Sequence, residues 1–259
     1  MTTDAVDIGR ALDVARRAAA RAGDIALRHF RQPLEIETKD DDSPVTIADR
    51  ECERAIRALL EAEFPDHAVH GEEYGRSGEH RCLWLIDPID GTRSFIRGLE
   101  FWSVQIALMV DDELVLGVSA APPFGETAWA VSGRGARLDD RPLSVAATDS
   151  FGRMDLSLGN VRSLARGPGW TRVGELVQRA ARTRGYGDFY PYHRLAAGSL
   201  DAVVESDVNI LDIAALTVIV REAGGVVSQL DGAPVGLDST SIVAAVPALH
   251  ARLVSFLND

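Results

Sequence analysis

The chain has 259 residues, 46% of them hydrophobic, and a mean hydropathy of -0.01, which together indicate a globular protein able to bury a large core. Its net charge of -12 disfavours nucleic acid polymers and anionic membranes as partners, so a phosphate ligand would need metal ions or backbone amides to compensate. No apolar run approaches the roughly 20 residues that span a bilayer, and the N-terminus lacks the features of a signal peptide, so we expect a cytoplasmic protein.

The first quarter of the chain is predicted to be mainly helical. Apolar residues at helical spacing predict one long amphipathic helix over 6–30, with Gly23 as a candidate interruption. The acidic segment 37–46 contains a proline and is expected to be a loop. A second helix is predicted over 46–64, because apolar periodicity resumes there and a proline follows.

Strands replace helices in the next part of the chain. Alternating apolar residues predict a largely antiparallel sheet of roughly five or six strands. Its expected members are 68–70, 82–86, 103–110, 114–121 and two hairpin elements between 126 and 146. Tight turns are predicted at Asp111-Asp112 and Asp139-Asp140. Cys52 and Cys82 lack metal-binding spacing and are expected to be buried thiols.

The pattern changes again near residue 148, which divides the chain into two predicted halves, 1–148 and 149–259. The second half is expected to alternate strands with helices. Its predicted strands are 154–158, 183–185, 202–205 and 242–246, and its predicted helices are 171–181, 189–197, 213–223 and 247–257. Gly224-Gly225 is the expected C-cap of the third of these helices.

Carboxylates follow or precede apolar segments in both halves. The set comprises Glu72, Glu73, Asp87, Asp90 and Asp212. Each has an ordinary explanation when taken alone, as a solvated loop acid, a turn acceptor or a helix N-cap. Buried together they would repel one another at high cost, so bound divalent cations are the simplest explanation for the whole set.

The stretch Asp87-Pro88-Ile89-Asp90-Gly91-Thr92 concentrates this chemistry. Its proline is predicted to fix a turn that aims both carboxylates and the Ile89 carbonyl into one pocket, and such oxygen ligands suit Mg²⁺. If a helix begins at Gly91, the Gly91 and Thr92 amides form a phosphate site. The Thr92 hydroxyl is a candidate to orient a water with the help of Asp49, whose alternative role is a helix capping box.

These residues resemble the inositol monophosphatase family of metal-dependent, lithium-sensitive phosphatases. The resemblance spans nearly the whole chain and rests on four motifs in the family's order and spacing: SPVTIAD (43–49), GEE (71–73), WLIDPIDGTRSFIRG (84–98) and LDIAALTVIVREAGG (211–225). It implies an α+β fold layered αβαβα, like that of fructose-1,6-bisphosphatase, with an N-terminal antiparallel sheet and a C-terminal mixed sheet. It also implies a homodimer that uses two or three Mg²⁺ ions per site, with Mn²⁺ as a substitute, on a small phosphorylated metabolite.

The resemblance assigns roles to particular residues. The implied metal ligands are Glu72, Asp87, the Ile89 carbonyl, Asp90 and Asp212. Asp49 would pair with Thr92 to activate the attacking water, with Glu72 assisting, and the Gly91 and Thr92 amides would hold the phosphate. Lys39 resembles a basic residue in a mobile loop of the family near a third metal, although a solvated loop lysine is the alternative. The first half would then carry most of the metal and phosphate residues.

The second half would carry the last metal ligand and the residues that select the substrate. The segment 184–206 resembles the histidinol-phosphate phosphatase branch of the family, whereas Leu211 and Ser94 stand where Trp and Asn are common. Asp188 and Glu205 would favour a substrate with an ammonium and an imidazole, although Asp188 has a helix cap as its alternative role. Arg184 lies near the same loop and is a further candidate, with a purely structural role as its alternative.

The resemblance to the histidinol-phosphate phosphatase branch implies hydrolysis of L-histidinol phosphate to L-histidinol and phosphate, a step of histidine biosynthesis, and we expect direct attack of a metal-activated water. Alternatives with the same chemistry are inositol 1-phosphate, fructose 1,6-bisphosphate and adenosine 3',5'-bisphosphate. A non-catalytic metal-binding scaffold is the least supported reading, because a structural role alone does not require the complete set of site residues.

Overall fold

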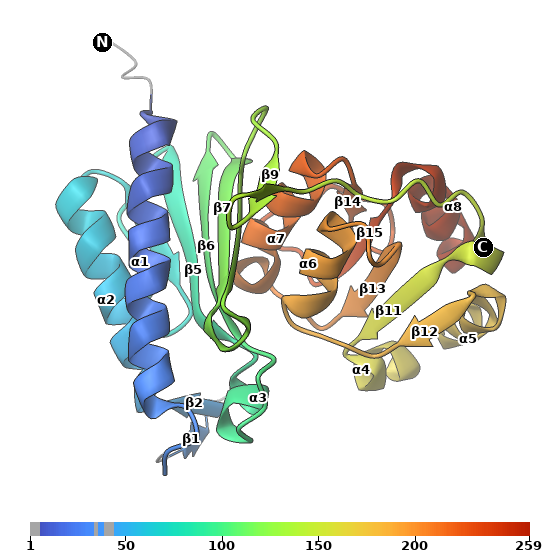
Figure 1. Ribbon diagram of the computed structural model, residues 1–259, viewed down its shortest axis with the longest axis horizontal. Coiled ribbons are helices and arrows are strands. Elements are labelled where there is room, and N and C mark those ends of the chain that lie inside the picture. The colour runs from blue at the N-terminus through green and yellow to red at the C-terminus, as the bar shows by residue number, and fades with distance from the viewer. Residues whose placement is uncertain (1–5, 34–35, 39–43) are drawn as a thin grey trace.

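The computed structural model describes residues 6–33, 36–38 and 44–259. These residues form five layers in the order αβαβα, with two outer helical layers, two sheets and a helical layer between the sheets (Figure 1). The layered α+β fold predicted from the sequence is therefore confirmed.

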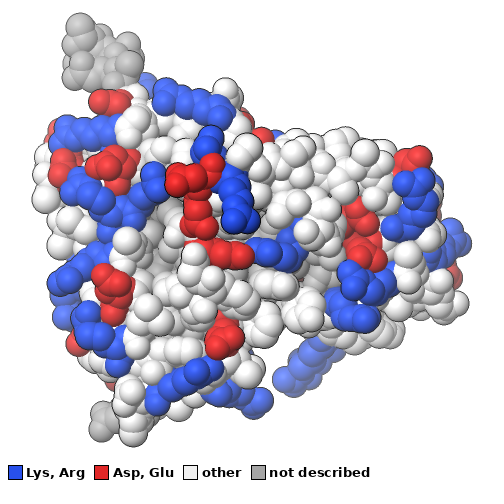
Figure 2. All heavy atoms as spheres, in the orientation of Figure 1, with Lys and Arg blue, Asp and Glu red and all other residues white. Residues whose placement is uncertain are grey.

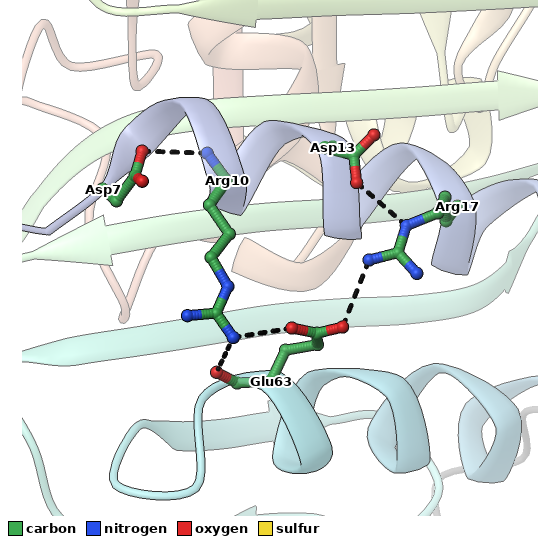
Figure 3. Close-up of polar contacts among 5 residues, drawn as sticks. All are labelled: Asp7, Arg10, Asp13, Arg17 and Glu63. Atoms are coloured by element: carbon green, nitrogen blue, oxygen red, sulfur yellow. Dashed lines mark hydrogen bonds and ion pairs between the residues drawn. The ribbon is translucent and has the colours of Figure 1, made fainter.

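The first layer consists of α1 (Ile8–His29) and α2 (Ile47–Glu63), as the apolar periodicity predicts. Gly23 does not interrupt α1, so that expectation was wrong. A Cβ at Gly23 would lie 2.8 Å from the Pro122 ring, and the missing side chain instead permits close packing. At the outer surface, Arg10 and Arg17 of α1 both pair with Glu63 of α2, at N–O distances of 2.6 and 3.3 Å (Figure 3).

The segment predicted as a loop over 37–46 contains two short strands in its described part. These are β1 (Ile36–Thr38) and β2 (Pro44–Thr46), which pair antiparallel. Residues 39–43, including Lys39, lie outside the described residues.

The first sheet has the strand order β10-β9-β8-β7-β6-β5-β3-β4 and is antiparallel except for the β3–β5 pair. Its members are β3 (Ala68–Gly71), β4 (Gly75–Ser77), β5 (Cys82–Asp90), β6 (Ser103–Val110), β7 (Glu113–Ala121), β8 (Glu126–Val131), β9 (Ala136–Leu138) and β10 (Arg141–Pro142). The sequence indicated too few strands because β4 and β10 are too short to show an alternating pattern.

The middle layer contains α6 (Tyr190–Ala196) and α7 (Ile210–Glu222). Nearly every residue of α7 is buried, because sheets cover the helix on both sides. The helix lies so close to β7 that a Cβ at Gly117 would come within 2.8 Å of the Ala215 Cα. Gly224, at φ 91°, follows the end of α7 as its predicted cap.

The second sheet has the order β12-β11-β13-β15-β14 and is mixed. Its strands are β11 (Asp155–Gly159), β12 (Arg182–Arg184), β13 (Ala202–Ser206), β14 (Val226–Ser228) and β15 (Ser241–Ala245), with β11 parallel to both β12 and β13. Its outer face is covered by α4 (Val161–Arg166), α5 (Trp170–Arg179) and α8 (Pro247–Asn258). Of these helices only α4 was not predicted, since six residues show too little periodicity.

Two apolar cores hold the layers together. One lies between α1, α2 and one face of the first sheet, and the other extends from the opposite face of that sheet through α7 to the second sheet. Residues 143–150, which link the two sheets, contain no helix or strand, and the division of the chain at residue 148 stays a prediction. Cys52 and Cys82 are buried free thiols, as expected.

Charged side chains of both signs are interleaved on the face that Figure 2 shows, despite the net charge of -12. None of the helices formed by the described residues is long and apolar enough to cross a membrane.

Candidate active site

The Asp87–Asp90 stretch is a bulged end of β5 and not the separate turn predicted from its proline. Asp87 pairs with Gln105 and Asp90 with Ser103, so three residue steps on β5 oppose two steps on β6. In a regular strand, residues three apart face opposite sides of a sheet. Because of the bulge, both carboxylates face the same side of β5. Both are buried, since Asp87 is 2% exposed and Asp90 is 6% exposed.

A third carboxylate joins them from α7 in the second half of the chain. Oxygens of Asp87, Asp90 and Asp212 all lie within 4.8 Å of one another. Asp212 is not the N-cap residue of α7, which is Asn209. It accepts hydrogen bonds from the Asn209 backbone N and Nδ2, both at 2.9 Å. A capping box thus holds Asp212 in position beside the other two acids.

These carboxyl groups carry strongly shifted pKa values. Burial, followed by the charges of Glu72, Asp90 and Asp212, raises the pKa of Asp87 well above its usual range. Burial together with neighbouring acids likewise raises the pKa of Asp90, and it raises the pKa of Asp212 to about 7. Acids that are so hard to ionise together are well suited to hard divalent cations, which would remove the repulsion.

Two further predicted ligands adjoin this cluster. Glu72 follows β3 directly, its backbone N donates to the Ile86 carbonyl at 3.3 Å, and its charge acts on Asp87. The Ile89 carbonyl accepts a hydrogen bond from the Thr92 hydroxyl at 3.0 Å. The donor set therefore consists of oxygen atoms, which fits Mg²⁺ better than softer metals.

Asp49 forms the predicted capping box and also lies beside Thr92. Its Oδ2 accepts hydrogen bonds from the Thr46 backbone N at 2.8 Å and the Thr46 hydroxyl at 2.6 Å, which completes the capping box of α2. Its Oδ1 lies 3.3 Å from the Thr92 hydroxyl. Burial raises the pKa of Asp49, so this carboxylate is held ready to accept a proton.

Gly91 connects the bulge to α3 (Thr92–Ile96) as the N-cap residue of that short helix, so the condition set for a phosphate site at the Gly91 and Thr92 amides is met. Its φ of 89° is in the left-handed region that favours glycine. A Cβ there would also lie 2.6 Å from the Phe101 carbonyl and 3.2 Å from the Asp188 carboxyl carbon. Only glycine allows the backbone to pass this closely between Phe101 and Asp188.

The residues predicted to select the substrate lie at the carboxyl ends of the parallel strands β11, β12 and β13. Ligands of α/β proteins commonly bind at this edge of a sheet. Glu205 of β13 is 3% exposed, and the Tyr192 hydroxyl donates to its Oε2 at 2.8 Å. Burial raises the pKa of Glu205 to about 8.

Asp188 is partly buried and lies in the loop after β12. It does not cap α6, whose N-cap residue is Phe189, so the capping alternative is wrong. Burial, opposed by a hydrogen bond from Ser94, raises the pKa of Asp188 to about 6. Arg184 is exposed, and its guanidinium donates to the Thr183 carbonyl at 2.8 Å.

Asp188 and Glu205 face a small cavity of about 40 Å³ beside the metal-ligand candidates. We call it the acid cavity. Its lining comprises Asp90, Asn160, Asp188, Tyr192, Glu205, Val208, Asp212, Ile213 and Leu216. Arg184 is not among these residues. Sequence reasoning missed Asn160 and Tyr192; the position of Asn160 directly after strand β11 was the available signal for the first.

A wider cleft of about 510 Å³ shares Asn160 with the acid cavity. It is lined by Arg93, Asn160, Arg162, Ser163, Arg166 and Asp207. Basic side chains thus lie directly beside the acidic site in a protein with excess negative charge.

The sequence of the chain matches a known family. The sequence profile of the inositol monophosphatase family matches residues 8–259. The chain belongs to the inositol monophosphatase family. Two curated relatives, both described as histidinol-phosphatases, are 38% identical to it. The Streptomyces coelicolor protein aligns over 87% of this chain and 88% of its own length, and the Mycobacterium tuberculosis protein over 95% and 97%.

Solved structures support the same assignment. The structure of an inositol monophosphatase from Zymomonas mobilis is 32% identical, with a TM-score of 0.88, and the match covers 98% of this chain and all of that chain. The predicted family membership is therefore confirmed by sequence and by fold.

Proposed function

We propose that this protein is a Mg²⁺-dependent phosphomonoesterase that hydrolyses L-histidinol phosphate to L-histidinol and phosphate. The observation that carries the proposal is the meeting of Asp87, Asp90 and Asp212 from two distant parts of the chain, with their oxygens within 4.8 Å of one another. Histidinol phosphate is the preferred ester because two relatives described as histidinol-phosphatases align over most of their length.

The metal ions are assigned to the oxygen ligands beside the β5 bulge. These ligands are Glu72, Asp87, the Ile89 carbonyl, Asp90 and Asp212. Two or three Mg²⁺ ions, with Mn²⁺ as a substitute, would supply Lewis acidity and neutralise charge on the phosphoryl group. Lys39 is proposed to lie in a loop that supports the site or a third ion.

The remaining groups position the reactants. The Gly91 and Thr92 amides are proposed to hold the phosphate. The Thr92 hydroxyl would take a proton from the attacking water as it passes its own proton to Asp49 Oδ1, which lies 3.3 Å away. Glu72 is proposed to assist in orienting that water, and the leaving alkoxide would depart on the side of the acid cavity.

Asp188 and Glu205 are proposed to recognise the non-phosphate end of the substrate. Histidinol phosphate is cationic at that end, and a buried and a partly buried carboxylate favour a cation over a neutral polyol. The aromatic side chains of Phe101, Tyr186 and Tyr190, with ring centroids 5.2–5.6 Å apart beside Asp188, provide a surface for the imidazole.

A second candidate function is hydrolysis of another small phosphate ester. Inositol 1-phosphate is favoured by the similarity to the Zymomonas mobilis enzyme. Fructose 1,6-bisphosphate and adenosine 3',5'-bisphosphate carry a second phosphate, which the cleft lined by Arg93, Arg162 and Arg166 would suit. A metal-binding scaffold without activity is the least favoured reading.

Phosphate release from these four esters in Mg²⁺ tests the proposal. We expect histidinol phosphate to have the highest kcat/KM, and the Asp90→Asn variant to lose at least about 100-fold on every ester. Asp188→Ala should weaken turnover of histidinol phosphate selectively. Equal kcat/KM values for inositol 1-phosphate and histidinol phosphate would contradict the substrate assignment, and an active Asp90→Asn variant would contradict the metal assignment.

The family resemblance also leads us to propose a cytoplasmic homodimer that acts on a metabolite in histidine biosynthesis. Light scattering coupled to size-exclusion chromatography measures the oligomeric state directly. A monomeric mass would contradict this part of the proposal.

A further inference from the structure

The acid cavity is too small for the ring of any candidate substrate. Its volume is about 40 Å³, whereas a cavity that holds benzene, a ring little larger than imidazole, measures about 150 Å³. An ammonium group or a hydroxyl fits this space, but an imidazole or an inositol ring does not. A substrate can therefore place only one small substituent in the cavity and must keep its ring outside.

The cavity adjoins the site proposed for the metals and the phosphate, because Asp90 and Asp212 belong to both. The substituent that enters must then be close to the phosphate ester. In histidinol phosphate the amino group is on the carbon next to the ester carbon, four bonds from phosphorus. The imidazole is on the other side of that carbon.

Glu205 provides an acceptor for such a group. Glu205 is only 3% exposed. Of its two carboxylate oxygens, Oε2 alone accepts a hydrogen bond from the Tyr192 hydroxyl. No donor within the described part of the chain reaches Oε1. A Cβ at Gly159 would overlap the Glu205 carboxylate, so a glycine on the neighbouring strand makes room for it in this position.

The remaining lining favours a cation over a neutral group. Asp188, which is not among the assigned metal ligands, lines the same cavity as Glu205, together with the apolar side chains of Val208, Ile213 and Leu216. None of the lysines and arginines that the structure describes lines it. A hydroxyl would have to donate its single proton to one of several acceptors, whereas an ammonium donates three.

We infer that the acid cavity binds the amino group of 2-aminoalkyl phosphates, so that this enzyme selects its substrates by the charged amine next to the ester and not by the ring. This inference rests on the proposed phosphatase function and narrows its substrate class. The ring lies outside the cavity, where its identity has a smaller effect on kcat/KM than the amine has.

The test compares pairs of esters that differ only in amine against hydroxyl. The first pair is L-histidinol phosphate and its 2-hydroxy analogue, and the second, without a ring, is L-alaninol phosphate and propane-1,2-diol 1-phosphate. We expect a kcat/KM preference for the amine of at least about 30-fold in both pairs, as is typical when a buried polar site is left unpaired. Calorimetry should show the same order for the products, with L-histidinol binding more tightly than its 2-hydroxy analogue.

A Glu205→Gln variant identifies the group responsible. We expect this variant to lower kcat/KM for the amine ester, and so to reduce the amine preference at least about 10-fold. The kcat/KM for the hydroxyl ester and inhibition by inorganic phosphate should stay unchanged. Glu61→Gln, an exposed change on α2, is the matched control and should leave both values at wild-type level. The comparison of substrates in the wild-type protein does not depend on whether Glu205→Gln folds.

The outcomes separate this inference from the proposed function. Turnover of histidinol phosphate with no amine preference in either pair would overturn the inference while leaving the phosphatase assignment in place. A Glu205→Gln variant that loses both members of a pair equally would also overturn it, since Glu205 would then act at the phosphate end. Failure to hydrolyse any histidinol phosphate, with inositol 1-phosphate accepted, would overturn the proposed function itself.

Discussion

At the scale of single residues, Thr92 is the clearest link between structure and chemistry. Its hydroxyl has one proton and two acceptors, the Ile89 carbonyl at 3.0 Å and Asp49 Oδ1 at 3.3 Å. The other oxygen of Asp49 is already occupied by two donors from Thr46. The capping box thus holds Asp49 with its second oxygen near the Thr92 hydroxyl, which is the geometry that the proposed proton relay needs.

Replacing Thr92 with Val should therefore remove activity without removing the metal site. We expect kcat with the best ester to fall about 100-fold or more, because general acid–base groups contribute on that order. Thr92→Ser keeps the hydroxyl and should stay within about 10-fold of wild type. Steady-state kinetics and Mg²⁺ binding by calorimetry measure the two effects separately; a Val variant with wild-type kcat would exclude the relay to Asp49.

At the scale of elements, the site depends on two local deviations from regular structure. The bulge between Asp87 and Asp90 turns both carboxylates to one side of β5. The close contact of α7 with β7 at Gly117 sets the position of the helix that carries Asp212. Neither feature is catalytic, but each decides whether the acids converge.

A Gly117→Ala substitution should displace α7 and weaken the metal site at a distance. A methyl group there would lie 2.8 Å from the Ala215 Cα, and overpacking of this kind costs about 1–3 kcal/mol in the free energy of unfolding. We expect a lower unfolding midpoint and weaker Mg²⁺ binding. Gly174→Ala in α5 is the matched control, because nothing lies within 4 Å of its added methyl group, and it should stabilise the protein by about 0.5–1 kcal/mol. Unchanged Mg²⁺ affinity in Gly117→Ala would show that α7 does not need this contact.

At the scale of the whole molecule, the site is made by contact between the two sheets and the helical layer that separates them. The first sheet contributes Asp87 and Asp90, α7 contributes Asp212, and the second sheet contributes Glu205. Folding therefore brings together acids that are far apart in the chain. In the metal-free protein their repulsion should oppose folding once they ionise.

The free energy of unfolding should consequently depend on pH more strongly without metal than with it. The pKa of Asp212 is raised to about 7 and that of Glu205 to about 8. In the metal-free protein the contribution of these two groups to the free energy of unfolding is therefore present at low pH and is lost as pH rises through these values. Buried histidines such as His193, whose pKa is lowered by burial, act in the opposite direction below about pH 6.5. We therefore expect the unfolding midpoint in EDTA to fall between about pH 6.5 and 8.5, and Mg²⁺ to reduce or abolish that fall.

Thermal unfolding monitored by circular dichroism at about pH 6.5 and about pH 8.5, with EDTA or with Mg²⁺, measures this change in the unfolding midpoint. Asp212→Asn should show a smaller fall in EDTA, because the amide does not ionise. A midpoint in EDTA that rises over this range would show that the buried acids do not repel one another in the folded protein.

Much of the molecule follows from local sequence patterns. The helices α1, α2, α7 and α8 and the strands from β5 to β7 lie close to where periodicity, caps and turns predict them, since these are properties of neighbouring residues. The acids of the site were also identifiable, because carboxylates next to buried segments are conspicuous in a sequence. Their individual roles came from the resemblance to the family and stay predictions.

Other features depended on residues that are distant in sequence. The bulge at Asp87–Asp90, the glycine contacts at positions 23 and 117, and the assignment of Asn160 and Tyr192 to the acid cavity required the packed layers. The sequence by itself determined which residues could hold a metal, because their chemical type and local spacing are written in the chain. Only the tertiary structure decided how small the neighbouring cavity is and which acids face it, because burial and distance between sheets arise from packing and not from order along the chain.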